Sequence, residues 1–256
     1  MENILNIKII IKFILKKFGM RIISEHAYQN LCSNIKNLNL SEKKYKKFLT
    51  VNKESRSELK QEGFALLETN FKTRGFFVEI GATNGFYASN TYLLEKKFKW
   101  KGILAEPAKI WHGDLYKNRS CFIEKNCVWS YSGKIINFSE TKIPSFSTVN
   151  KFTNKDMHKN IRKDSKNYKV NTISLIDLLK KYNAPKIIDY LSIDTEGSEF
   201  EILEKFDFNS YKFNFISCEH NYNSSVRKKI NNLLKKNGYN IKYSQYSSYD
   251  DWYVSN

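Results

Sequence analysis

Four points in the sequence carry acidic or glycine residues directly after an apolar stretch. They are Glu79–Gly85 in VEIGATNG, Glu106 in ILAEP, Asp194–Gly197 in SIDTEGSE and Glu219–His220 in ISCEHN. Carboxylates accept hydrogen bonds from hydroxyl and ammonium groups, and a histidine beside a carboxylate is suited to proton transfer or metal binding. The sequence therefore predicts a polar ligand site assembled from four separate segments.

The elements that position these residues follow from short apolar runs that alternate with helical patterns after about residue 58. The runs that we expect to form strands are GFFVEI, KGILAEP, CFIEKNCVWS, KVNTIS, IIDYLSID, FNFISCEH, YNIKYS and DWYV. Strands that alternate with helices are typical of a doubly wound, mostly parallel α/β sheet. Such a sheet binds ligands at the carboxyl ends of its strands, so the four points should meet at one edge.

The turn after the first expected strand favours a cationic ligand over a dinucleotide. Gly81 and Gly85 allow the backbone to turn tightly and approach a ligand, and the following helix offers free N–H groups. A nicotinamide-binding turn would read G-x-G-x-x-G, whereas this turn lacks a third glycine. Glu79 adds a carboxylate that can accept a hydrogen bond from an ammonium group. The combination is typical of S-adenosylmethionine sites.

The later strand ends supply further acids. Glu106 lies where a carboxylate can accept both hydroxyls of a ribose, although an acid there can also stabilise the start of a helix. Asp194 follows an apolar strand and, with Glu196, should lie at the sheet edge. Ser198 and Glu201 have the spacing of a capping box, which places Glu201 at a helix start and outside the site.

In the order of these motifs, the chain resembles the FkbM family of S-adenosylmethionine-dependent methyltransferases. The matching pieces, within residues 58–254, are FFVEIGATNGFYASNT, ILAEP, VNTISLIDLL, APKIIDYLSIDTEGSEFEIL, ISCEHN and DDWYV. The resemblance implies an α/β, Rossmann-like class I methyltransferase fold with a doubly wound, mostly parallel seven-stranded sheet and an antiparallel last strand. It also implies O-methylation of a hydroxyl on a sugar, glycan or related secondary metabolite.

Carried over by position, the resemblance assigns the methionine end of the cofactor to the first turn and its ribose to Glu106. Asp194 would flank the transferred methyl group. Asn126 or Cys127, at the end of the third expected strand, would lie near the adenine, where this sequence lacks the acid that many methyltransferases have. The cofactor-binding residues implied by the resemblance are Glu79, Gly81, Ala82, Asn84, Gly85, Glu106, Asn126 and Asp194.

Catalysis is expected at the last two strand ends. Asp194, Glu219 and His220 could supply a base for the acceptor hydroxyl, or they could bind a divalent metal such as Mg²⁺ that lowers the hydroxyl pKa. A catalytically degenerate binding or trafficking module with the same fold is a second hypothesis, which the strand-end acids oppose. A nicotinamide-dependent oxidoreductase is a third, which the missing G-x-G-x-x-G opposes.

The net charge of +17 is concentrated in two segments. Residues 1–60 hold 13 basic and 5 acidic side chains, and residues 141–169 hold 8 and 2. Only six of the 43 basic residues are arginine, the residue on which nucleic-acid recognition most depends, so we expect no nucleic-acid partner. The segment 141–169 is expected to be either solvated surface or a lid that selects an anionic, lipid-linked acceptor, with Lys155, Lys159 and Arg162 as its cations.

Residues 1–23 predict an amphipathic helix, because four lysines recur on one side of an apolar pattern: Lys8, Lys12, Lys16 and Lys17. This helix either packs on the domain or lies on an anionic membrane face. No apolar run reaches about 18 residues, and the four cysteines form no paired motif, so we expect a reduced, cytoplasmic chain, peripheral at the inner face of a membrane. The expected organisation is a basic helical appendage, 1–57, and a methyltransferase domain, 58–256, with a basic insertion loop at about 141–169.

Overall fold

The computed structural model describes residue 38, residues 40–154 and residues 159–256. The chain divides into two compact units, residues 1–54 and 55–256. The described part of the first unit contains helix α3, Glu42–Glu54. The amphipathic helix expected over residues 1–23 lies outside the described residues. In the parts of the chain that the structure describes, no helix is both long enough and apolar enough to cross a lipid bilayer.

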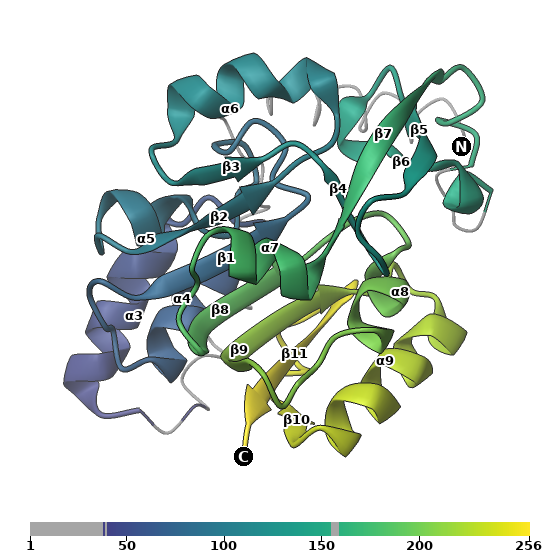
Figure 1. Ribbon diagram of the computed structural model, residues 1–256. Helices are drawn as coiled ribbons and strands as arrows, with labels where there is room; N and C mark the ends of the chain where they lie inside the picture. The colour runs from purple at the N-terminus through teal and green to yellow at the C-terminus, as the bar shows by residue number, and fades with distance from the viewer. Residues whose placement is uncertain (1–37, 39, 155–158) are drawn as a thin grey trace, which may run out of the picture. The chain divides into compact units, whose positions relative to one another are not determined.

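The second unit is built on a seven-stranded sheet (Figure 1) with the order β10-β11-β9-β8-β1-β2-β3. Strands β1, β2, β3, β8 and β9 pair in parallel, whereas β11 is antiparallel to both of its neighbours. This confirms the predicted Rossmann-like methyltransferase fold, including the antiparallel last strand. The strand bounds are β1 Phe76–Ile80, β2 Lys101–Ala105, β3 Phe122–Glu124, β8 Ile187–Ile193, β9 Lys212–Glu219, β10 Tyr239–Ile241 and β11 Asp250–Ser255.

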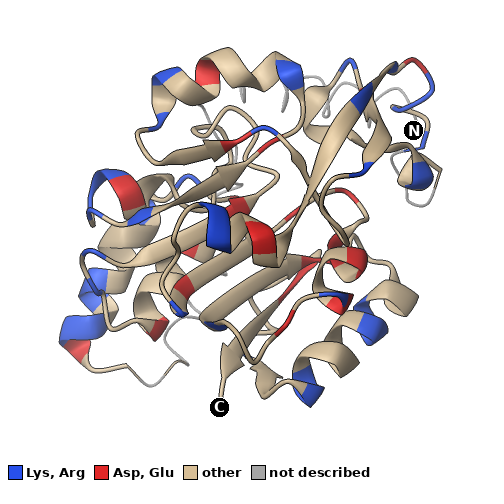
Figure 2. Ribbon diagram, in the orientation of Figure 1, with Lys and Arg blue, Asp and Glu red and all other residues tan. Residues whose placement is uncertain are grey.

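The central strands are apolar on both faces because helices cover both faces of the sheet. One face carries Val78 and Ile216 and packs in a single core with residues of α7, α8 and α9. On the opposite face, Phe64 of α4 packs on Trp252 with ring centroids 4.7 Å apart. The helices of this unit are α4 Gln61–Glu68, α5 Tyr92–Lys96, α6 His112–Asn118, α7 Leu175–Lys181, α8 Glu199–Glu204 and α9 Ser224–Lys236. Figure 2 shows basic residues on α6, α7 and α9.

A second sheet lies between β3 and α7 in the chain and has the strand order β4-β7-β5-β6. Its strands are β4 Cys127–Trp129, β5 Ile135–Glu140, β6 Thr148–Val149 and β7 Lys166–Ser174. The segment expected to be a loop, 141–169, therefore contains β6 and the start of β7. The second sheet has its own small core, which includes Phe138, Val149 and Phe152. The residues of this core are spread from Ala108 to Val170, so no local periodicity indicates the sheet.

The apolar run CFIEKNCVWS forms two strands in different sheets, which corrects the single strand expected there. Strand β3 ends at Glu124, whose Oε1 accepts the Asn126 N–H at 2.9 Å, and β4 begins at Cys127. The polar residues between the two strands form a bend. The chain leaves the large sheet at this bend and enters the small one.

Candidate active site

The ends of β1 and β8 lie in direct backbone contact. The Asp194 N–H donates to the Ile80 carbonyl at 3.0 Å. Gly81 follows with φ +86°, and a Cβ atom at this position would lie 1.7 Å from the Asp194 carbonyl oxygen. Only glycine fits both the left-handed conformation and this close approach. Gly81 thus places the first turn beside Asp194, at the point where the strand order reverses.

The Glu79 side chain is hydrogen-bonded to residues that follow this turn. Its carboxylate accepts the Asn90 N–H at 2.7 Å and the Ser89 hydroxyl at 3.0 Å, and Arg119 Nη1 lies 3.7 Å away. Burial raises the pKa of Glu79, and the charge of Arg119 opposes that rise. The Glu79 carboxylate is therefore hydrogen-bonded to groups of the protein, and its contact with the methionine end of a cofactor stays a prediction. No motif in the sequence indicates a role for Arg119, because only the fold brings it to β1.

The other residues of the turn act through the backbone. Gly85 has φ +71°, and a Cβ there would lie 2.6 Å from Arg119 Cγ; the Arg119 Nη1 donates to the Gly85 carbonyl at 3.0 Å. Asn84 Oδ1 accepts the N–H groups of Phe86 and Tyr87. Ala82 is 1% exposed. These side chains hold the turn in shape, so a ligand on this side would meet backbone groups.

Glu106 joins the ends of β1 and β2. Its Oε2 accepts the Thr83 N–H and its Oε1 accepts the Ala108 N–H, both at 2.8 Å. Burial, with smaller contributions from the negative charges of Glu140 and Glu79, raises the pKa of Glu106 to about 7. Each carboxylate oxygen can accept more than one hydrogen bond, so both oxygens can still receive hydroxyl groups. Glu106 thus lies where the sequence predicts a ribose ligand.

The third strand end differs from the prediction. An acid is present there, because β3 ends at Glu124, whereas the sequence predicts the strand end at Asn126 or Cys127. Glu124 Oε2 forms an ion pair with Lys181 at 2.6 Å. Cys127 is buried in the core of the small sheet, where burial raises its pKa to about 12. Asn126, which is half-buried, remains the predicted neighbour of the adenine.

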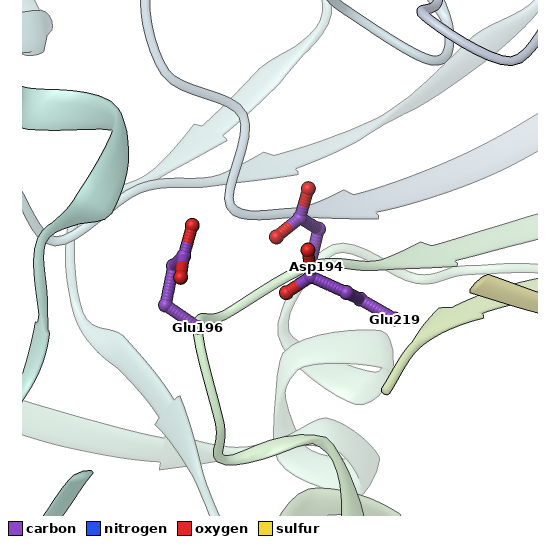
Figure 3. A group of neighbouring side chains, drawn as sticks. All are labelled: Asp194, Glu196 and Glu219. Carbon is purple, nitrogen blue, oxygen red and sulfur yellow. The ribbon is translucent and has the colours of Figure 1, made fainter. Parts of the chain in front are cut away.

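Three carboxylates converge beyond the first turn (Figure 3). Asp194, Glu196 and Glu219 each offer one oxygen, and these oxygens lie within 4.8 Å of one another. Burial, then the negative charge of Asp250, raises the pKa of Asp194 to about 8. Burial, then the charge of Asp194, raises the pKa of Glu219. We call Asp194, Glu196 and Glu219 the carboxylate group.

His220 does not belong to the carboxylate group, which corrects the predicted metal set of Asp194, Glu219 and His220. Its ring is 5% exposed, Nδ1 accepts the Tyr222 N–H at 3.2 Å, and Nε2 lies 3.9 Å from the Asp251 carboxylate. Burial lowers its pKa. Strand β9 ends at Glu219, and the His220 ring that follows lies beside Tyr222 and Asp251. Glu196 takes its place in the group.

Glu196 is held by the insertion between β3 and α7. Its Oε2 accepts Arg162 Nη2 at 2.8 Å and Asn221 Nδ2 at 3.3 Å, and its carbonyl accepts the Thr148 hydroxyl at 3.0 Å. The backbone of Glu196 has φ +60°, a conformation rare for a residue with a side chain. Arg162 is buried, so it serves this turn and is not one of the exposed cations expected of a lid. Lys159 is exposed, and Lys155 lies outside the described residues.

The turn that carries Asp194 is closed by Glu199, and not by the capping box of Ser198 and Glu201 that the sequence predicts. Glu199 Oε1 accepts the N–H groups of Thr195 and Gly197 at 2.8 and 3.1 Å. The Ser198 side chain caps no N–H of α8, so the predicted capping box with Glu201 is wrong. Glu199 therefore stabilises the turn, and the carboxylate group keeps its three members.

A protein-family model described as Methyltransferase FkbM domain matches residues 79–241. The chain belongs to this family. The FkbM match begins at Glu79 and includes Glu106 and the whole carboxylate group. Membership in the FkbM family supports methyl transfer as the general reaction and implies S-adenosylmethionine as the cofactor.

Among solved structures, the FkbM chain is similar to the crystal structure of precorrin-6y C5,15-methyltransferase from Geobacter metallireducens GS-15. The identity is 11% and the TM-score 0.38, over 75% of this chain and 85% of that chain. No curated protein matches the chain. The fold assignment rests on the strand order of the seven-stranded sheet, in which β1 separates the two halves.

Proposed function

We propose that this FkbM protein is an S-adenosylmethionine-dependent O-methyltransferase that acts on a hydroxyl group of a sugar, glycan or related secondary metabolite. The proposal rests on the position of the carboxylate group. The group lies beside the close contact between Gly81 and Asp194, at the switch point of the sheet. A cofactor site and a proton-accepting site are therefore contiguous.

The residues at the strand ends fit the cofactor by their chemistry. Glu106 would hold the ribose hydroxyls with both carboxylate oxygens, and the backbone of the Gly81–Gly85 turn would bind the methionine end. When bound, S-adenosylmethionine supplies an electrophilic methyl group on a positively charged sulfur. The side chain of Asp194 would lie beside that positive charge, which a carboxylate favours.

Asp194 and Glu219 are proposed to receive the hydroxyl proton of the acceptor. They end neighbouring strands, β8 and β9, and their oxygens lie in one group. A positioned base of this kind typically contributes a rate factor of about 10²–10⁴. His220 is left out of the proposal because its nitrogens face Tyr222 and Asp251.

The charges around the site favour a neutral hydroxyl acceptor over the anionic, lipid-linked one considered from sequence. Three carboxylates converge here, and two basic residues of the insertion are already paired: Arg162 with Glu196, and Lys151 with Glu201 at 3.0 Å. Without a bound cation, an anionic acceptor would be repelled by the carboxylates and would not gain these two basic side chains. We therefore expect neutral sugars and polyols to be the better substrates.

The test combines calorimetry with a transfer assay on the full chain. S-adenosylmethionine should bind and NAD should not, and methyl label should pass to neutral sugar hydroxyls. Asp194→Asn should lower turnover by about 10²-fold or more while changing cofactor affinity much less. Glu204→Gln is a matched control, since Glu204 lies on the exposed side of nearby α8. Tight NAD binding, or cofactor binding without methyl transfer to any hydroxyl, would contradict the proposal.

A further inference from the structure

Among the described residues, Arg162 is the one basic side chain that pairs with the carboxylate group. Arg162 pairs with Glu196, but within the described part of the chain neither Asp194 nor Glu219 forms an ion pair with a basic side chain. Glu58, Glu199 and Asp250 add further negative charge around Asp194. Negative charges gathered at a buried site are stable only when protons or cations compensate for them.

Glu219 points to a missing ligand. Its side chain is 7% exposed, and among the described residues its Oε2 has no hydrogen-bond partner. Native proteins leave few buried carboxylate oxygens unpaired, because each such atom has lost its water without replacement. Figure 3 shows this carboxyl group beside those of Asp194 and Glu196, and one of its oxygens lies within 4.8 Å of theirs.

We infer that the carboxylate group binds a divalent metal ion. Three carboxylate oxygens within 4.8 Å of one another match the hard oxygen ligands of Mg²⁺, Mn²⁺ or Ca²⁺, whose metal–oxygen distances are about 2.0–2.6 Å. The ion takes Glu219 Oε2 and one oxygen each from Asp194 and Glu196. This set replaces His220, an imidazole that such hard cations favour less, by a third carboxylate.

Glu196 can bind an ion and keep its bond to Arg162. Its Oε2 accepts Arg162 Nη2, and this bond fixes the direction of a carboxylate that has an oxygen within 4.8 Å of those of Asp194 and Glu219. Second-sphere contacts of this kind orient metal ligands. Asp194 likewise offers one oxygen to the ion and keeps the other for the acceptor.

The inference rests on the proposed function for what the ion does. An ion held here would have positions open on the side of the acceptor, where it would bind the hydroxyl oxygen and favour loss of its proton. The proton would pass to the second oxygen of Asp194. The binding of the ion itself does not depend on this role, so it can be measured alone.

The experiment titrates the full chain with Mn²⁺, without cofactor or acceptor, and follows free Mn²⁺ by electron paramagnetic resonance. One site should fill below about 1 mM, the weak end of protein calcium sites, and Mg²⁺ should compete for it. Glu219→Gln should weaken Mn²⁺ binding at least tenfold, and so should Asp194→Asn. Glu204→Gln, which changes an exposed acid on α8, should leave binding unchanged.

Two outcomes would overturn the inference: no site filled at millimolar Mn²⁺, or a site that survives both Glu219→Gln and Asp194→Asn. Thermal unfolding of each variant shows whether it is folded, and for a variant that does not fold, Glu196→Gln supplies the same test. Failure here is distinct from failure of the proposed function. If the carboxylates hold only a shared proton, S-adenosylmethionine still binds, and methyl transfer continues in EDTA.

Discussion

At the scale of residues, the buried acids of this protein differ in what compensates for them. Glu79 is bonded to its own turn and lies beside Arg119, and Glu196 is bonded to Arg162. Glu106 accepts only backbone N–H groups, and Glu219 has one oxygen with no partner among the described residues. Acids that the protein has already paired support the structure. Acids whose oxygens can still accept hydrogen bonds or bind a cation are the candidates for contact with a ligand.

Glu106 should make cofactor affinity depend on pH. Its pKa is about 7, raised by burial, and only the carboxylate can accept two ribose hydroxyls. Below pH 7 the acid becomes protonated and the competent fraction falls, so the Kd for S-adenosylmethionine should rise about tenfold between pH 8 and pH 6. Calorimetry across this range measures the effect.

Variants of the same residue give the control. Glu106→Ala should weaken cofactor binding by about 1–3 kcal/mol at pH 8, as expected for lost hydrogen bonds from a charged acceptor. Glu106→Gln cannot titrate, so its affinity should be flat between pH 6 and pH 8. An unchanged affinity in Glu106→Ala would remove Glu106 from the ribose site.

Gly81 is the residue whose replacement should cost the most stability in the turn. A Cβ at Gly81 would lie 1.7 Å from the Asp194 carbonyl oxygen, in a backbone with φ +86°. Gly81→Ala should lower the free energy of unfolding by about 3 kcal/mol. Part of this loss is the cost of an alanine in a left-handed backbone conformation, and part is the cost of pushing the ends of β1 and β8 apart. Urea denaturation measures it.

Gly133 supplies the matched control, because it has φ +71° and open space where a Cβ would lie. Gly133→Ala should cost only about 1 kcal/mol, which is the conformational part alone. Equal losses for the two variants would show that the close approach to Asp194 contributes nothing.

At the scale of elements, the insertion that contains β4 to β7 reaches the site through a few side chains. Arg162 donates from Nη2 to Glu196 and from Nε to the Phe146 carbonyl. Gly197, next to Glu196, packs on Phe152, so that a Cβ there would lie 3.1 Å from the Phe152 Cβ. The insertion therefore braces the turn between β8 and α8, on which two of the three converging carboxylates stand.

Removing Arg162 should destabilise the protein. Arg162→Gln leaves Glu196 buried without its cation, and breaking one side of a buried ion pair costs about 3 kcal/mol. The double variant Arg162→Gln with Glu196→Gln should recover part of that loss, because no uncompensated charge remains. Lys142→Gln breaks an exposed pair with Asp164 in the same insertion and should cost less than about 1 kcal/mol. Equal losses from Arg162→Gln and Lys142→Gln would contradict a bracing role for Arg162.

At the scale of the whole molecule, charge and chemistry lie in different parts of the chain. The FkbM match covers residues 79–241, whereas residues 1–60 carry 13 basic and 5 acidic side chains. For residues 1–23, packing on the domain and contact with an anionic membrane surface remain the two predictions.

Replacing Lys8, Lys12, Lys16 and Lys17 together by glutamine should reduce sedimentation with vesicles that contain phosphatidylserine. The expected loss is roughly 1 kcal/mol of binding per lysine, and added salt should weaken binding by the unchanged protein. A matched control changes four lysines of α9: Lys228, Lys229, Lys235 and Lys236. If both variants lose binding equally, net charge alone attracts the protein to the membrane.

The sequence by itself determined the fold class and the strand ends. Alternating apolar runs and helical patterns predict a doubly wound sheet, and the motifs from VEIGATNG to IDTEGSE identify the FkbM family. These features are local, because strand length, turn glycines and strand-end acids are written in neighbouring residues. They were therefore readable without a structure, and so was the expectation that Glu106, Asp194 and Glu219 share one edge.

Only the tertiary structure decided which partner each acid receives. Arg119 meets Glu79 and Arg162 meets Glu196 across long stretches of chain, and no periodicity records such contacts. The structure also places Glu196, and not His220, in the carboxylate group. The His220 ring lies beside Tyr222 and Asp251, whereas Glu196, whose backbone is left-handed, has an oxygen near those of Asp194 and Glu219. Side-chain direction at a strand end depends on the turn that follows, and that turn is fixed by packing against the insertion.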